Sequence, residues 1–137
     1  MFKVKAIAQG RCKEPWLLAA LAEYEKRLHG SLQIEWVFTE NAEELADKSL
    51  KEPILIALDI QGEMLNSAAF SEKWMRMGAR VSFVIGGPTG LPKKVLEKAR
   101  WRWSLSKLTF TNQIARLLLV EQLYRALEIA RGSPYHK

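Results

Sequence analysis

A glycine-rich turn is the part of this sequence whose residue types point most directly to ligand binding. The apolar run at residues 81–85 predicts a buried strand. The stretch Gly86-Gly87-Pro88-Thr89-Gly90 follows it, before a helix that begins near Pro92. Open α/β sheets bind ligands where a strand ends, and residues without side chains let a bound molecule contact the backbone. The spacing matches neither a Rossmann loop nor a P-loop. The segment therefore indicates a ligand site of another geometry, and a tight turn without a ligand is the alternative.

Basic residues gather in the last third of the chain, beside this turn. Of the net charge of +6, residues 93–137 supply 10 Lys or Arg against 3 Asp or Glu, whereas residues 1–92 are close to neutral. Trp101 and Trp103 alternate with two of the arginines and offer aromatic surface for stacking. A basic, aromatic patch is typical of proteins that bind nucleic acid, and a solvated basic face is the alternative. The candidate RNA-binding residues here are Lys93, Lys94, Lys98, Arg100 and Arg102.

The C-terminal tail carries a second set of chemically useful groups, Tyr135, His136 and Lys137. An imidazole can act as an acid or a base near neutral pH, although a terminal tail is expected to fray. Cys12 is the only cysteine, which excludes an intrachain disulfide and favours a reducing, cytoplasmic setting. Cys12, His29 and His136 form no metal-ligand pattern, so we expect no metal.

The elements that must position these groups alternate between strand and helix patterns. A length of 137 residues fits one domain, residues 1–137, and no apolar run is long enough to span a membrane. Strands are predicted near residues 2–8, 32–38, 54–59, 81–85 and 101–106, and helices near residues 15–28, 41–44 onward, 68–77, 92–98 and 112–130. This alternation predicts an α/β fold with a mainly parallel sheet.

The last predicted helix, residues 112–130, is apolar on more than one side. One stripe contains Leu117, Val120, Tyr124 and Leu127, and another contains Leu119, Leu123, Ala126 and Ala130. An amphipathic helix on a monomer needs only one apolar face. The second stripe predicts a homodimer with this helix in its interface, and burial on two sides within one domain is the alternative.

Four motifs, taken in order along the chain, resemble those of one known family. They are VIGGPTG at residues 84–90, WSLSKLTF at 103–110, LLVEQLYRA at 118–126 and PYHK at 134–137. By these motifs the chain resembles the RlmH family, part of the SPOUT superfamily of S-adenosylmethionine-dependent methyltransferases. The resemblance extends over essentially the whole chain and is densest from Val81 onward.

The resemblance implies a fold, a cofactor and a substrate. It implies a single SPOUT domain with a C-terminal trefoil knot, which general topology rules alone do not favour. It also implies a homodimer that uses S-adenosylmethionine to methylate N3 of a pseudouridine in an intersubunit hairpin of 23S ribosomal RNA. The target lies in the large ribosomal subunit or the assembled ribosome.

Matching positions one by one, the resemblance also implies site residues. The residues expected around S-adenosylmethionine are Leu58, Gly86, Leu105, Ser106, Lys107, Leu108, Thr109 and Phe110. In the tail, Tyr135 and His136 match residues linked to catalysis or to RNA engagement, and Lys137 is expected at the RNA. The tail departs from the family pattern at Ser133, where relatives carry histidine, and at Lys137, where many carry arginine. Lysine keeps the charge but loses the planar fork.

Two other functions remain open on the sequence. One is a non-catalytic ribosome- or RNA-binding protein with a degenerate cofactor pocket. The other is an α/β enzyme that acts on a small phosphorylated substrate at the glycine turn. The dense basic patch favours a larger polyanion over such a substrate.

In the methylation that the resemblance implies, the proton on N3 must leave before or during methyl transfer. Tyr135, His136 or water could receive it.

Overall fold

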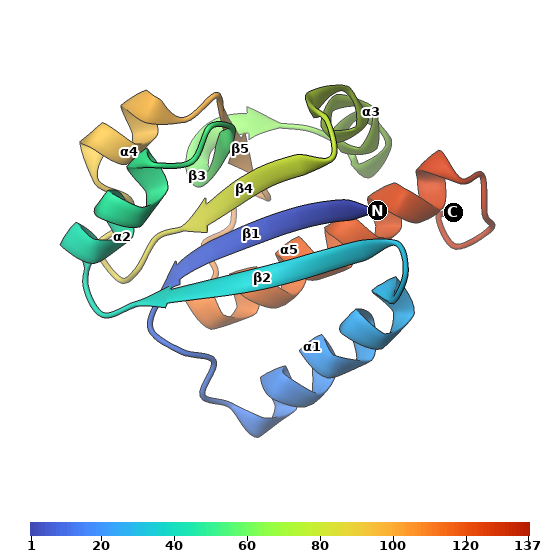
Figure 1. Ribbon diagram of the computed structural model, residues 1–137, viewed down its shortest axis with the longest axis horizontal. Helices are drawn as coiled ribbons and strands as arrows, with labels where there is room; N and C mark the ends of the chain where they lie inside the picture. Colours follow the sequence, from blue (N-terminus) through green and yellow to red (C-terminus); the bar gives the residue numbers. More distant parts are fainter.

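Five strands, all parallel, form the central sheet in the order β2-β1-β4-β3-β5 (Figure 1). The computed structural model describes residues 1–137. The strands are β1 (Phe2–Gln9), β2 (Leu32–Thr39), β3 (Leu55–Met64), β4 (Arg80–Ile85) and β5 (Trp101–Ser104). The helices are α1 (Pro15–Leu28), α2 (Ala42–Leu50), α3 (Ser67–Met77), α4 (Lys93–Lys98) and α5 (Asn112–Ala130). The predicted α/β fold with a parallel sheet is confirmed, whereas the trefoil knot stays a prediction.

Helices cover both faces of the sheet, which explains why its central strands are apolar on both sides. Along β1, Val4, Ala6 and Ala8 point to the face that α1, α3 and α5 cover, and Ile7 points to the face that α2 and α4 cover. Figure 1 shows α1 and α5 together on one side of the sheet and α2 beside α4 on the other. None of the helices is both long enough and apolar enough to cross a membrane.

Two helices begin at capping residues that the sequence makes recognisable. The Asn41 side chain accepts a hydrogen bond from the Glu44 backbone N–H at 2.8 Å, as predicted for the start of α2. The Glu44 carboxylate accepts from the Glu40 N–H at 3.4 Å, one residue earlier than a capping box requires. The α3 helix begins after Asn66, which caps it in the same way, and ends at Gly78.

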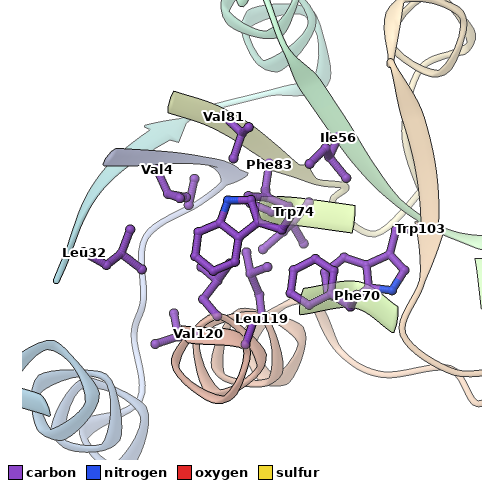
Figure 2. Close-up of a cluster of buried hydrophobic side chains, with 14 of the residues drawn as sticks. Val4, Leu32, Ile56, Phe70, Trp74, Val81, Phe83, Trp103, Leu119 and Val120 are labelled. Atoms are coloured by element: carbon purple, nitrogen blue, oxygen red, sulfur yellow. The ribbon is translucent and has the colours of Figure 1, made fainter. Parts of the chain in front are cut away.

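The larger core lies between the sheet and α1, α3 and α5. It contains Trp101 and Trp103, which we expected at the surface; Figure 2 shows Trp103 beside Phe70. Trp103 stacks on Phe70 with 4.0 Å between ring centroids, and Trp101 and Trp103 are only 7% and 2% exposed. Residues that alternate along a strand share a face. Both indole rings therefore face α3, and Arg102 alone points to solvent. The prediction that these tryptophans offer a stacking surface to nucleic acid is wrong.

The α5 helix is buried on two sides within one chain. Leu119 and Leu123 are fully buried, and Val120, Ala126 and Leu127 are nearly so. Figure 2 shows Leu119 and Val120 pointing into the same core as Trp74 and Phe83. The helix contacts α3 and α1 as well as the sheet. The prediction that the stripe with Leu119 and Leu123 forms a dimer interface is therefore wrong, because the fold itself covers that stripe.

Candidate functional site

A hollow of about 250 Å³ lies at the carboxyl ends of β3, β4 and β5. This edge is where parallel α/β sheets place their ligands. The hollow brings together most of the residues expected around a cofactor, which come from a strand end, the glycine turn and the loop before α5. Those that line it are Leu58, Gly86, Leu105, Ser106, Leu108, Thr109 and Phe110. Lys107 belongs to the same loop but does not line the hollow; its side chain is exposed.

The glycine turn closes tightly, and this closure requires a glycine at position 86. The Gly90 N–H donates to the Gly87 carbonyl at 3.0 Å, and Gly90 has a φ of +80°. A Cβ atom on Gly86 would lie only 2.7 Å from the Gly90 carbonyl carbon and 3.0 Å from the Leu91 nitrogen. We expected a side chain at Gly86 to meet the cofactor, but it would first displace the backbone of the turn.

The loop between β5 and α5 is held by its own hydroxyl groups. Ser104 Oγ donates to the Ser106 carbonyl at 2.9 Å, and Ser106 Oγ accepts from the Leu108 N–H at 3.0 Å. Thr111 then caps α5 by accepting from the Ile114 N–H at 3.2 Å. These local bonds fix the loop without help from distant residues, so the wall it forms is defined before any ligand binds.

The chemistry of the hollow suits a ligand with one apolar face and one charged end. Its lining is mainly apolar, with hydroxyls from Ser106 and Thr109, the amide of Asn112 and one carboxylate, Asp59. Asp59 is partly buried, and its Oδ1 accepts from the Gln61 N–H at 3.1 Å. The apolar surface and loop backbone fit an adenine ring, and the carboxylate fits a cationic or hydroxylated group.

Two of these polar lining residues were missed by the sequence interpretation. In the sequence Asp59 follows the apolar run at residues 54–58, and a polar residue at the end of such a run is a recognisable signal for a ligand-binding position in a parallel sheet. Asn112 carries no comparable signal, because a polar residue at a helix start is ordinarily part of the cap.

A second cluster of polar groups forms where the tail folds back on α5. The Tyr135 hydroxyl donates to Glu121 Oε2 at 2.7 Å, and Arg125 donates to the same carboxylate oxygen at 2.9 Å. Arg125 Nη1 lies 3.0 Å from His136 Nδ1, and the Tyr135 ring packs edge-on against Tyr124. The tail was expected to be exposed and flexible, but these contacts attach it to α5.

The contacts in this tail cluster bear on the chemistry open to Tyr135 and His136. Burial, followed by the hydrogen bond to Glu121, raises the pKa of Tyr135 well above the ordinary value for tyrosine. Tyr135 is therefore a hydrogen-bond donor and not a base near neutral pH. An arginine can only donate, so His136 Nδ1 is the acceptor in this contact. Both residues predicted as catalytic thus contact side chains of α5, and their catalytic role stays a prediction.

The tail cluster and the first hollow are neighbours. A second hollow of about 510 Å³ lies between them, with His136 and Gln122 on one side and residues 66–68 on another. It shares Trp103, Leu105 and Phe110 with the first hollow. A flat group held against the tail cluster would therefore lie beside a ligand in the first hollow, within one chain.

The predicted RNA-binding residues are all at the surface. Lys93, Lys94 and Lys98 project from α4, which contributes Leu96 to the lining of the first hollow. Arg100 and Arg102 follow at the exposed edge, where Arg102 Nε donates to the Leu96 carbonyl at 3.2 Å. Lys137 is exposed at the end of the tail. No group of three or more His, Cys, Asp or Glu side chains is arranged to hold a metal ion.

The fold and the site together define an α/β protein with a hollow suited to a small ligand at the carboxyl edge of a parallel sheet, next to a polar cluster and a basic surface. The chain belongs to the SPOUT methyltransferase family: the family model described as "Predicted SPOUT methyltransferase" matches residues 2–136.

Relatives of known name cover the whole chain. It is 45% identical over 141 residues to ribosomal RNA large subunit methyltransferase H of Protochlamydia amoebophila, with all of both chains aligned. It is 39% identical over 159 residues to the protein of the same name from Pelotomaculum thermopropionicum, with 99% of each chain aligned.

Among solved structures, the fold is similar to that of a methylase family protein from Haemophilus influenzae. The TM-score is 0.60 at 13% identity, over 99% of this chain and 70% of that one. A methyltransferase from Legionella pneumophila, solved with bound S-adenosylmethionine, has a TM-score of 0.50 at 10% identity, over 92% and 66% of the two chains.

Proposed function

We propose that the protein is an S-adenosylmethionine-dependent methyltransferase of 23S ribosomal RNA that acts on N3 of a pseudouridine, the position-1915 type. The observation that carries this proposal is the placement of the first hollow beside the tail cluster, on a chain whose full-length relatives are named for ribosomal RNA methylation. A protein that methylates ribosomal RNA would act in the cytoplasm, and its partner would be the large subunit or the assembled ribosome.

The residues of the first hollow fit S-adenosylmethionine. Leu58, Leu105 and Phe110 offer apolar surface for adenine, the tight turn at Gly86 leaves backbone exposed, and Asp59 offers a negative charge to a cationic ligand. When bound, this cofactor supplies an electrophilic methyl group. We expect Ser106 and Asn112 to orient it through hydrogen bonds, and holding two reactants in register can supply much of the rate enhancement.

The tail cluster would position the nucleotide and would not accept its proton. Burial and then the hydrogen bond to Glu121 raise the pKa of Tyr135 and keep it protonated, and His136 Nδ1 is occupied by Arg125. The Glu121 carboxylate itself accepts hydrogen bonds from Tyr135, Gln122 and Arg125, so both of its oxygens are already engaged. Of the three acceptors open on the sequence, we therefore favour water for the N3 proton, with the His136 and Tyr135 rings contacting the base.

The basic surface of α4 predicts RNA binding that weakens with salt. Replacing Lys93, Lys94 and Lys98 together with glutamine should weaken binding to ribosomal particles, because a lysine that neutralises a phosphate releases counterions. The slope of log affinity against log salt should become shallower by up to about 0.7–0.9 for each phosphate that the variant no longer neutralises. Filter binding over a salt series measures this slope, with Lys26→Gln on the exposed face of α1 as the control. An unchanged slope in the triple variant would place the RNA on another face.

A homodimer remains part of the proposal, although its interface differs from the one first predicted. Large apolar side chains are exposed at Trp16 and Leu18 on α1 and at Ile114 on α5. These surface positions are better candidates for a subunit contact than Leu119, which is fully buried in the chain's own core. Sedimentation should give about twice the chain mass for the wild type, and Leu18→Asp with Ile114→Asp should give a folded monomer.

Mass spectrometry of ribosomal RNA tests the proposed function directly. In cells that lack the protein, one pseudouridine of 23S RNA should lose a methyl group, and the wild-type gene should restore it. A methyl group that persists would contradict the proposal. If the RNA is unmodified in both strains and calorimetry detects no cofactor binding, the protein is an RNA-binding relative with a degenerate pocket.

A further inference from the structure

Arg116 near the start of α5 is a buried cation without an acidic partner. Its side chain is 0% exposed, no other lysine or arginine of the chain is buried, and none of the ion pairs includes it. Burying a charge is costly unless it is paired or hydrogen-bonded. The contacts that replace an acid at this position therefore indicate what the residue does.

The Arg116 guanidinium contacts only neutral groups. Its Nη2 donates to the Gln9 carbonyl at 2.8 Å and to Asn112 Oδ1 at 3.0 Å, and its Nη1 lies 3.5 Å from Cys12 Sγ. The guanidinium carbon lies 5.6 Å from the centroid of the Phe38 ring, and Nε has no partner. One planar group thus joins the end of β1, the loop after it and the first turn of α5.

Two of these contacts reach the walls of the first hollow. Asn112 lines that hollow, and Gln9 lies against the glycine turn that forms another of its walls. The turn and Gln9 are in close contact, because a Cβ atom on Gly87 would lie 2.4 Å from Gln9 Oε1. Arg116 therefore connects two walls of the first hollow, one formed by the start of α5 and one formed by the glycine turn. The connection runs through Gln9, whose carbonyl accepts from Arg116 and whose side chain lies beside the turn.

A neighbouring bond reinforces the link. Gln113 Nε2 donates to the Arg11 carbonyl at 3.1 Å, so two successive turns of α5 hold the loop between β1 and α1. A purely structural arginine would stabilise the chain without a particular relation to the hollow. Here the bonded groups converge on the residues that form it.

We propose that Arg116 is a positioning residue for the cofactor site, holding Asn112 and the turn at Gly87 at a fixed separation. This inference rests on the proposed function, because it takes S-adenosylmethionine as the ligand of the first hollow. The extent of the guanidinium matters to this role. Its Nη2 serves both Gln9 and Asn112, while Nη1 approaches Cys12 and the group lies over the Phe38 ring; a lysine ammonium could reach the two oxygens but not make all of these contacts together.

The test compares ligand affinity with stability in two variants. Arg116→Met removes every donor, and Arg116→Lys keeps the charge but loses the fork. S-adenosylhomocysteine is titrated by calorimetry at a temperature where circular dichroism shows each variant folded. We expect at least about a 10-fold loss of affinity in Arg116→Met, or roughly 1.4 kcal/mol, and a smaller loss in Arg116→Lys. Leu28→Ala, in the core far from the hollow, should lower the melting temperature and leave affinity unchanged.

A double-mutant cycle shows whether Arg116 acts through Gln9. Gln9→Ala removes the side chain that lies against the turn, and its effect on affinity should be less than additive with that of Arg116→Met. If Arg116→Met does not fold, amide exchange in Arg116→Lys provides the readout. The Gly90 N–H, bonded to Gly87, should then exchange faster than in the wild type.

The outcomes separate this inference from the function on which it rests. A wild type that does not bind S-adenosylhomocysteine overturns both. A wild type that binds, with folded Arg116 variants of unchanged affinity and unchanged exchange at Gly90, overturns only the role of Arg116. If Leu28→Ala lowers the affinity as much as Arg116→Met does, the effect of Arg116 is one of general stability, and Arg116 is a structural residue.

Discussion

Replacing Gly86 with valine is expected to abolish binding of S-adenosylmethionine while the chain stays folded. Even the first atom of the new side chain would lie 2.7 Å from the backbone of Gly90, so the turn must open or move. The two further methyl groups of valine would then occupy space at the floor of the hollow. We expect a loss of affinity of more than about 100-fold, or roughly 2.7 kcal/mol, as measured by calorimetry. Gly86→Ala should show an intermediate loss.

A matched glycine elsewhere distinguishes a local effect from general destabilisation. Gly30 lies between α1 and β2, outside the first hollow, and has a φ of +84°; a Cβ atom added there would meet nothing within 4 Å. Gly30→Ala should cost on the order of 1 kcal/mol through backbone strain alone. If Gly30→Ala and Gly86→Ala lower stability alike and affinity alike, the glycine turn is not the cofactor site.

The sequence predicted the fold well because its strongest signals are local and redundant. The continuous apolar run of β3, the Asn41 cap and the glycine stop at Gly78 each predict an element by its own chemistry, and the structure contains all three. Because strands and helices alternate along the chain, the sequence also predicts that helices connect the parallel strands. The end of β3 was less predictable: it continues to Met64 after an irregular register between Leu58 and Glu63.

Errors arose where a pattern shows which residues share a face but not which face is buried. Alternation places Trp101 and Trp103 together, and only the packing of α3 decides that they are inside. The two stripes of α5 posed the same problem, because a helix covered by both α1 and α3 has the same sequence pattern as one in a dimer. Long-range contacts, such as those of Arg116 with residues more than 100 positions away, have no sequence signal at all.

One part of the tail cluster can be predicted from the sequence, and the other part cannot. Glu121 and Arg125 are one helical turn apart, a spacing typical of a surface ion pair. That this pair would bind Tyr135 and His136 depends on how the chain turns back after α5, where Ser133 N–H donates to the Glu128 carbonyl at 3.0 Å. The Ser133 hydroxyl also accepts from the Tyr135 N–H, so serine at this position helps to form the turn.

Deleting residues 133–137 is expected to destroy methylation of the ribosome while cofactor binding stays within about 2-fold of the wild type. The tail lies outside the core and does not line the first hollow, so its loss leaves that site intact. Loss of the groups that orient the nucleotide should lower the rate by about 100-fold or more. Methyl transfer from labelled cofactor to ribosomal particles measures the rate, and near-normal methylation by the truncated protein would remove the tail from the mechanism.

Single substitutions then distinguish positioning from proton transfer. Because the pKa of Tyr135 is raised, its hydroxyl stays protonated from about pH 6 to 9, and Tyr135→Phe should lower the rate equally across that range. The raised pKa also makes stability depend on pH. The hydrogen bond to Glu121 contributes fully to the free energy of unfolding below the unfolded pKa of tyrosine, near 10, and this contribution is lost as the pH rises through the higher pKa of the folded state. The stability difference between the wild type and Tyr135→Phe should therefore shrink only at strongly alkaline pH.

His136→Ala completes the argument, because the two possible roles of the imidazole predict different losses. With Nδ1 occupied by Arg125, we expect the variant to bind ribosomal particles more weakly and to keep the shape of its pH–rate profile. Arg125→Lys should have a similar, smaller effect, since one ammonium cannot hold both Glu121 and His136 in the geometry of the fork. A profile that loses a limb near neutral pH in His136→Ala, with unchanged ribosome affinity, would instead identify His136 as the proton acceptor.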